Sequence, residues 1–128
     1  MKTPEETRAF FSADTLAALL GIEIDSLETG AAICSAELGD EHKNAVGAAQ
    51  GGFIFSLADF TFAVAANCAE HAWVTLSGTI SFVSSVRSGR LIAKARRVSE
   101  RSRVCFYEVT VECDDKIVAT AQFTGYRK

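Results

Sequence analysis

The sequence has 128 residues, of which 48% are hydrophobic and one is proline, so it is long and apolar enough to bury the core of one compact domain. The formal net charge is −3, and the acidic, polar start MKTPEETRAFF lacks the charged-then-apolar pattern of a secretory signal, so we expect no export. The apolar run 53–69 is short for a membrane span and carries Asp59 at its middle, which argues against a membrane protein.

The cysteines indicate a reducing environment. Cys34, Cys68, Cys105 and Cys113 form no Cys-x-x-Cys pair and do not cluster with the two histidines. We therefore expect no metal site, no disulfide framework and a cytoplasmic location with free thiols.

The predicted elements begin with one or two helices in 5–20, where apolar residues recur with helical spacing. Ser12 or Asp14 would cap the second part and Gly21 would end it. Residues 22–38 then alternate around Thr29-Gly30, which predicts a strand, a tight turn and a second strand.

Residues 39–50 have the composition of a loop, and Gly51-Gly52 opens a helix to about residue 70 that is apolar on nearly every side. Four β-type runs follow, at 74–86, 90–99, 104–113 and 116–126. Two of them should each bury one face, consisting of Cys105, Tyr107, Val109, Val111 and Cys113 in the first and of Ile117, Ala119, Ala121 and Phe123 in the second. This order predicts a single α+β domain over 1–128, in which an N-terminal helical segment (1–21) precedes an antiparallel sheet curled around one buried helix.

The start of the long helix is a candidate oxyanion site. The first amides of a helix lack internal partners, and Gly51 and Gly52 have no side chains to keep a carbonyl or phosphate oxygen away. The alternative is that the glycines only let the loop approach a neighbouring strand.

Asp59 is the lone acid of the helix. Burial would raise its pKa, as expected of a general base or nucleophile, unless it is simply bonded to a strand or an arginine. It lies eight residues after Gly51, or roughly 12 Å along the axis, too far to act on a group held by its own helix start. If both features serve one substrate, Asp59 must come from a second copy of the chain in a symmetric dimer.

Residues 87–103 contain seven bases and one acid, whereas residues 1–86 contain three bases and eleven acids. The basic block is either an anion-binding surface or a solvated sheet face. Binding to nucleic acid is a less favoured interpretation, because the rest of the chain is acidic.

The residues before and within the helix resemble a known motif: His42-x-Asn44-x-x-Gly47-x-x-Gln50-Gly51-Gly52, then Ser56-Leu57-Ala58-Asp59. It resembles hotdog-fold acyl-CoA thioesterases, in particular the phenylacetate-degradation (PaaI-like) type. The similarity covers nearly the whole domain, including the Gly-x-Leu-x-Ala-x-Ala run at 89–95.

The resemblance implies a hotdog fold, a homodimer that often pairs into a homotetramer, an acyl-CoA substrate and no cofactor, since coenzyme A is part of the substrate. The Gly51 amide would polarise the thioester carbonyl, and Asp59 of the partner chain would attack it or activate water. By position, Asn44 would orient the carboxylate or water, and Thr75 would hold the water. The remaining assigned residues are Gly52 and His42 at the substrate, and Arg101, Ser102 and Arg103 at the coenzyme A phosphates.

Gln50 departs from the family, which commonly has histidine there. Gln50 stays a catalytic candidate, because glutamine can still donate a hydrogen bond to a carbonyl oxygen, but it does not titrate near neutrality. The substitution motivates a second hypothesis, a non-catalytic acyl-CoA binding or sensing protein. A hydratase of the same fold would need a histidine paired with Asp59, for which His71 is the only candidate. The acyl group is left open, because Phe53, Phe60, Phe62 and Trp73 fit a pocket and a core equally.

Overall fold

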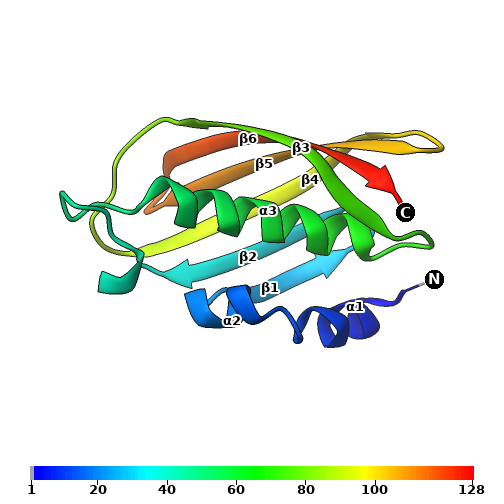
Figure 1. Cartoon of the computed structure of the whole chain (residues 1–128), viewed down its shortest axis with the longest axis horizontal. Coiled ribbons are helices and arrows are strands. Elements are labelled where there is room, and N and C mark those ends of the chain that lie inside the picture. Colours follow the sequence, from blue (N-terminus) through cyan, green and yellow to red (C-terminus); the bar gives the residue numbers. More distant parts are fainter. Residues whose placement is uncertain (1) are drawn as a thin grey trace.

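A computed structural model describes residues 2–128, and its first elements are two short helices, α1 (Pro4–Phe11) and α2 (Thr15–Leu20) (Figure 1). Of the two predicted caps for the second helix, Asp14 is the one used: its side chain accepts a hydrogen bond from the Ala17 amide. Gly21 ends α2 in the left-handed conformation (φ 72°), as expected of a glycine after a helix.

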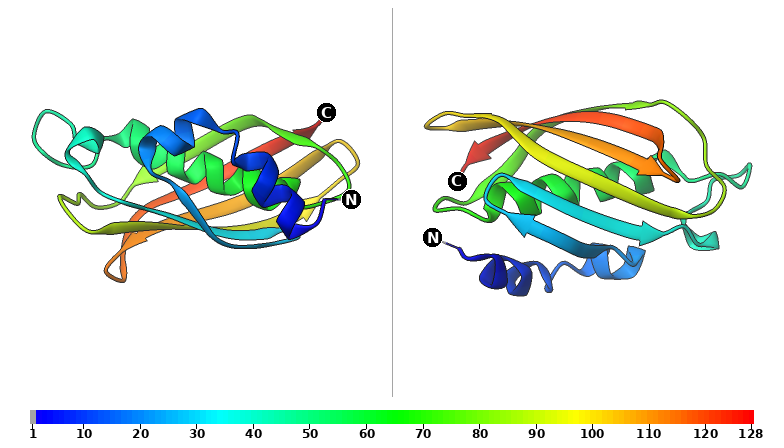
Figure 2. Two further views of the ribbon diagram at one scale, coloured as in Figure 1. Left: turned by 90° about the horizontal axis from the view of Figure 1, so that it is seen from below. Right: turned by 180° about the vertical axis from the view of Figure 1, so that it is seen from behind.

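The rest of the chain forms one six-stranded antiparallel sheet in the order β1-β2-β4-β5-β6-β3. Figure 2 shows this sheet curving around a single long helix, α3 (Gly51–Asn67). The strands are β1 (Glu23–Glu28), β2 (Ala31–Glu37), β3 (Trp73–Phe82), β4 (Arg90–Glu100), β5 (Val104–Cys113) and β6 (Lys116–Arg127). This is the α+β hotdog architecture that the sequence predicts.

Helix α3 is buried along most of its surface, since eleven of its 17 residues are buried. Phe62, Leu57 and Val64 are at most 1% exposed and fill the concave side of the sheet. A stripe formed by Phe55, Ser56, Asp59 and Ala63 is only half-buried. The helix is therefore enclosed on all sides but one, and Asp59 lies on the less covered side.

The predicted inward face of β5 is confirmed in full, whereas that of β6 is wrong at one residue. Ala119, Ala121 and Phe123 are buried, but Ile117 is 38% exposed, and Val118 is buried in its place. The cause is an irregularity in the β5–β6 register, where Val111 pairs with Ala119 but Glu112 pairs with Ile117.

Strand β3 ends at Phe82, four residues before the predicted end, because its regular pairing with β6 stops at Phe82 and Ala119. The amides of Val83 and Ser84 both bond to the Val118 carbonyl. β3 lies at the edge of the sheet and pairs only with β6. Several of its apolar side chains face solvent, including Leu76 (61% exposed) and Phe82 (53%).

Two features are not found among residues 2–128. No helix there is long and apolar enough to cross a membrane. Nor do three or more histidine, cysteine, aspartate or glutamate side chains gather there as a metal site.

Candidate functional site

The loop before α3 is built around His42, at the end of a short 3-10 helix, η1 (Asp40–His42). The His42 ring is 4% exposed and stacks on Phe53 with ring centroids 3.9 Å apart. Nδ1 accepts a hydrogen bond from the Gly39 amide (2.9 Å), which assigns the ring proton to Nε2, 2.8 Å from the Leu20 carbonyl. These contacts favour a structural role over the substrate contact that the resemblance implies.

Asn44 organises the next turn of the loop. Its Oδ1 accepts hydrogen bonds from the amides of Val46 (3.1 Å) and Ala48 (3.0 Å). Arg87 holds the same turn from outside, because its guanidinium donates to the Val46 carbonyl at 2.6 Å. The loop leading to α3 is thus fixed by side chains of the same chain.

Gln50 is the N-cap of α3, and its Oε1 accepts a hydrogen bond from the Gly52 amide. The Gly51 amide has no acceptor within residues 2–128. Of the two predicted donors, Gly51 is therefore the one left open, at the positive end of a 17-residue helix. A side chain at Gly51 would place its Cβ 3.0 Å from the Phe82 ring, so the glycine also allows this close approach.

A hollow of about 400 Å³ lies over the start of α3. Asn44 and Gly51 contribute to it from the loop and the helix, and Phe82 contributes from the end of β3. The structure thus brings two of the predicted site residues to one surface depression, with an unpaired backbone donor in its wall.

Asp59 and Thr75 meet at the middle of α3. The Thr75 hydroxyl donates a hydrogen bond to Asp59 Oδ1 at 2.7 Å. Burial raises the pKa of the Asp59 carboxyl above its ordinary value, while the Thr75 hydrogen bond lowers it and the nearby charge of Asp14 raises it. Asp59 is therefore held by a hydroxyl rather than by an arginine, in surroundings that favour proton uptake.

Asp59 also lines a cavity of about 120 Å³ between α2 and α3. Leu16, Leu20 and Phe60 supply apolar walls, and Asp14 supplies a second carboxylate. Of the four aromatic residues considered for an acyl pocket, Phe60 is the one that reaches this cavity. The other three, Phe53, Phe62 and Trp73, are buried in the core.

Gly51 and Asp59 do not share a hollow within one chain. They line different depressions, and eight residues of helix separate them, or roughly 12 Å. The structure thus forms two partial sites, one offering a hydrogen-bond donor and the other a carboxylate.

Most bases of the block at 87–103 form ion pairs with carboxylates of the same sheet. Four of its seven bases pair with carboxylates: Arg90 with Glu23 and Glu37, Lys94 with Glu112, Arg96 with Glu108, and Arg97 with Glu100. Arg87, Arg101 and Arg103 have no such pair within residues 2–128. This pattern does not make the continuous cationic surface that a nucleic-acid duplex would need.

Arg101, Ser102 and Arg103 form the exposed turn between β4 and β5. A residue that the sequence analysis missed joins them, because Arg127 donates its amide to the Arg103 carbonyl (2.9 Å) and its guanidinium to the Ser102 carbonyl (3.3 Å). Only the register of β6 beside β5 reveals this neighbour. Figure 1 shows the β4–β5 turn at the end of the molecule opposite the start of α3.

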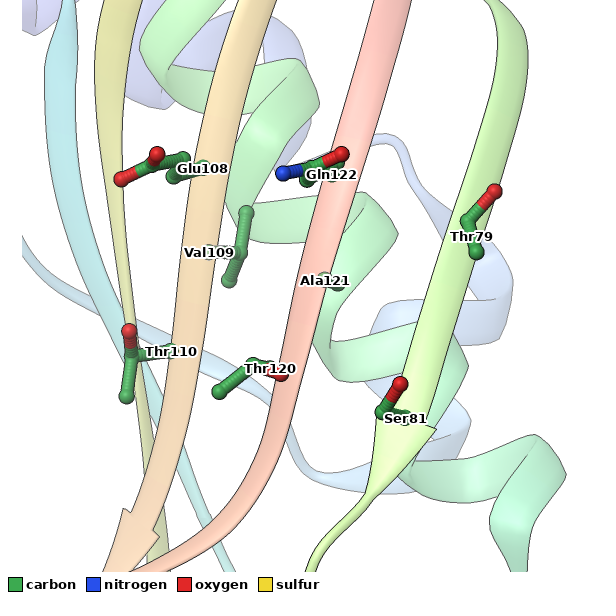
Figure 3. Close-up of a pocket in the computed structure, with 8 residues that line it drawn as sticks. All are labelled: Thr79, Ser81, Glu108, Val109, Thr110, Thr120, Ala121 and Gln122. Carbon is green, nitrogen blue, oxygen red and sulfur yellow. The ribbon is translucent and has the colours of Figure 1, made fainter.

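A further hollow of about 430 Å³ lies on the outer face of the sheet, and Figure 3 shows its side chains on β3, β5 and β6 with α3 behind them. Threonine, serine and glutamine side chains dominate it. Its one titratable residue, Glu108, is paired with Arg96 at 2.7 Å. This hollow offers no acid–base pair, so the surfaces around Gly51 and Asp59 are the better candidates.

In comparisons with known proteins, the matching family model and the similar proteins are thioesterases or esterases. Residues 46–120 match the family model described as Thioesterase superfamily. A putative esterase of Archaeoglobus fulgidus is 31% identical over 119 residues, covering 91% of this chain and 77% of that protein. The acyl-coenzyme A thioesterase PaaI of Escherichia coli strain K12 is 29% identical over 102 residues, covering 80% of this chain and 73% of that protein.

The fold has a close match among solved structures. The E. coli PaaI protein from the phenylacetic acid degradation operon superimposes with a TM-score of 0.93 at 28% identity. The match covers 97% of this chain and 91% of that one. It therefore includes the N-terminal helices as well as the sheet and α3.

Proposed function

Because this chain belongs to the thioesterase superfamily and is a thioester hydrolase of the PaaI-like type, we propose that it hydrolyses an acyl-CoA thioester to a free acid and coenzyme A at a site shared by two copies. One copy supplies the Gly51 amide and the other supplies Asp59. The hydrogen bond between Thr75 and the half-buried Asp59, beside a cavity, is the observation that carries the proposal.

In the proposed reaction, the thioester carbonyl oxygen accepts a hydrogen bond from the open Gly51 amide. Water attacks the carbonyl carbon while Asp59 takes its proton, the C–S bond breaks, and the coenzyme A thiolate leaves and is protonated. If Asp59 attacks instead, an acyl-aspartyl anhydride forms as the thiolate leaves, and water then cleaves it. Thr75 holds the carboxylate in either route, and Asn44 keeps the loop at the helix start in place.

Two features support the dimer. The separation of Gly51 and Asp59 along one helix leaves each partial site incomplete in a single chain. In addition, β3 is an edge strand with exposed apolar side chains at Val74, Leu76 and Phe82, a surface that pairing with a second copy would cover. A tetramer would add a second contact between such dimers.

We propose that the coenzyme A phosphates bind the turn formed by Arg101, Ser102 and Arg103. Arg101 and Arg103 have no carboxylate partner within residues 2–128. Their turn, between β4 and β5, lies at the end of the molecule opposite the start of α3 (Figure 1). Like Asp59, they would act on the substrate held by the partner's helix start. A cytoplasmic location is also proposed, and the four free cysteines are compatible with it.

The test is thiol release from a panel of aryl-, short- and long-chain acyl-CoAs by the parent and the Asp59→Asn variant. The variant should lose most turnover but not stability. Since burial raises the folded-state pKa of Asp59, ionisation costs the folded state stability as pH rises through that pKa. Asp59→Asn removes this cost, so at neutral pH the variant should unfold at higher urea than the parent, and the difference should vanish in acid.

Asp115→Asn is the matched control, because Asp115 lies in the β5–β6 turn at φ 62°, a conformation that asparagine tolerates. It should leave turnover unchanged. Full turnover by Asp59→Asn would refute the mechanism. Tight acyl-CoA binding by the parent without thiol release would instead identify a non-catalytic binding or sensing protein.

A further inference from the structure

Asp14 has two roles that the sequence does not connect. Its Oδ1 caps α2 by accepting the Ala17 amide at 3.0 Å, and the residue also lines the cavity that contains Asp59. An N-cap needs an acceptor oxygen but not a negative charge, since asparagine and serine cap helices about equally well. The charge of Asp14 is thus available for a different purpose.

The cavity has a simple chemical character. Its remaining lining consists of Leu16, Ala17, Leu20, Ile22, Phe60 and Ala63, which are apolar, and Ser56. Among residues 2–128, no lysine, arginine or histidine lines it. A ligand group entering the cavity meets aliphatic and aromatic walls and two carboxylates, with no cation to balance a third negative charge.

We propose that Asp14 is a specificity-determining residue, whose carboxylate beside Asp59 excludes acyl groups that carry a negative charge and restricts the site to compact, uncharged acyl groups. The inference rests on the proposed function, with this cavity receiving the acyl group. A terminal methyl group would pack on Leu16, Leu20 and Phe60, whereas a terminal carboxylate would be desolvated between like charges.

The groups around Asp59 support this assignment. The Thr75 hydroxyl faces it from β3 and Asp14 acts on it from α2, and the Asp14 charge helps to raise the Asp59 pKa. Removing that charge should therefore lower the Asp59 pKa. If Asp14 only capped α2, replacing it with an uncharged cap would leave the Asp59 pKa unchanged.

The experiment compares butyryl-CoA with succinyl-CoA, whose four-carbon acyl groups differ in ending with a methyl or a carboxylate. The parent should strongly prefer butyryl-CoA. Asp14→Asn keeps the cap and removes the charge. It should lower the ratio of kcat/KM for butyryl-CoA to kcat/KM for succinyl-CoA by about tenfold. The acid limb of the pH–rate profile for butyryl-CoA should also move to lower pH.

Asp14→Ser, another good cap without charge, should behave in the same way, and Asp115→Asn should leave the ratio and the pH profile unchanged. If both Asp14 variants hydrolyse butyryl-CoA but keep the parent ratio, the proposal is overturned while the proposed function stands. If the parent releases thiol from no acyl-CoA, the proposed function fails and this inference fails with it.

Discussion

The loop before α3 and the middle of α3 use their polar side chains in opposite ways. In the loop, His42, Asn44 and Gln50 each accept hydrogen bonds from backbone amides of the same chain. In the middle of the helix, Asp59 has a single hydroxyl partner and borders a cavity. The loop side chains thus act as scaffolding that leaves one donor open, the Gly51 amide, whereas the helix holds its carboxylate ready for a ligand.

The largest effect should come from removing the open donor. Gly51→Pro deletes the amide hydrogen at the first position of a helix, which proline tolerates. Gly51→Ala is the matched control, since it keeps the amide and puts the same Cβ against Phe82. We expect kcat for acyl-CoA to be about 10²–10³-fold lower for the proline variant than for the alanine variant, a loss typical of one oxyanion donor. Equal kcat values would show that the amide takes no part.

Mixing variants extends this test to the shared site. In a dimer of one Gly51→Pro chain and one Asp59→Asn chain, one site has both defects and the other has none. After random subunit exchange, about one quarter of all sites should be intact, so activity should recover to about a quarter of the parent value. No recovery after exchange verified by mass spectrometry would place Gly51 and Asp59 in the same chain's site.

His42→Phe should destabilise the loop before α3 without changing the catalytic step. Phenylalanine keeps the stacking on Phe53 but leaves the Gly39 amide and the Leu20 carbonyl without partners. The free energy of unfolding should fall by about 2–4 kcal/mol, as measured by urea denaturation. The kcat of the folded protein should change little. Loss of activity at unchanged stability would instead assign the ring to substrate binding.

Thr75→Val should have a smaller effect, because it changes only the pKa of the Asp59 carboxyl. The Thr75 hydrogen bond lowers the pKa of Asp59, so its removal lets burial raise that pKa further. The acid limb of the pH–rate profile should move to higher pH, so that kcat falls by about tenfold on that limb and little on the plateau above it. Thr79→Val, on the outer face of β3 (Figure 3), should leave the profile unchanged. A shift to lower pH would contradict the role given to Thr75.

The smallest effect should come from the β4–β5 turn, which we propose to bind the coenzyme A phosphates. Replacing Arg101 and Arg103 by glutamine should raise the KM for acyl-CoA several-fold at low salt and less at high salt, because exposed charges are screened. Arg96→Gln is the control, since Arg96 already pairs with Glu108. Equal KM values for the turn variant and the control would show that the turn does not bind the coenzyme A phosphates.

Local patterns were sufficient to predict much of this fold. A helix cap at Ser12 or Asp14, the glycine that ends α2 and the alternating face of β5 depend on neighbouring residues only. Helix α3 was predictable because an apolar helix must be enclosed. The separation of Gly51 from Asp59 followed from helix rise alone.

Other features depend on contacts that local patterns do not encode. Ile117 faces solvent because of an irregular register with the neighbouring strand. The hydrogen bond between Thr75 and Asp59 depends on how β3 passes α3, and Arg127 joins the β4–β5 turn through its place at the end of β6. The burial of His42 likewise requires the carbonyl of Leu20, 22 residues earlier.

Glutamine as the N-cap of α3 affects how the start of this helix depends on pH. Because Gln50 carries no ionisable group, its hydrogen bond from the Gly52 amide does not depend on a protonation state of the cap. A histidine there would introduce a group that titrates near neutrality beside the proposed binding position of the thioester carbonyl. In the proposed mechanism, the pH dependence of the reaction therefore comes from Asp59 and its neighbours Thr75 and Asp14, and not from the residue that caps α3.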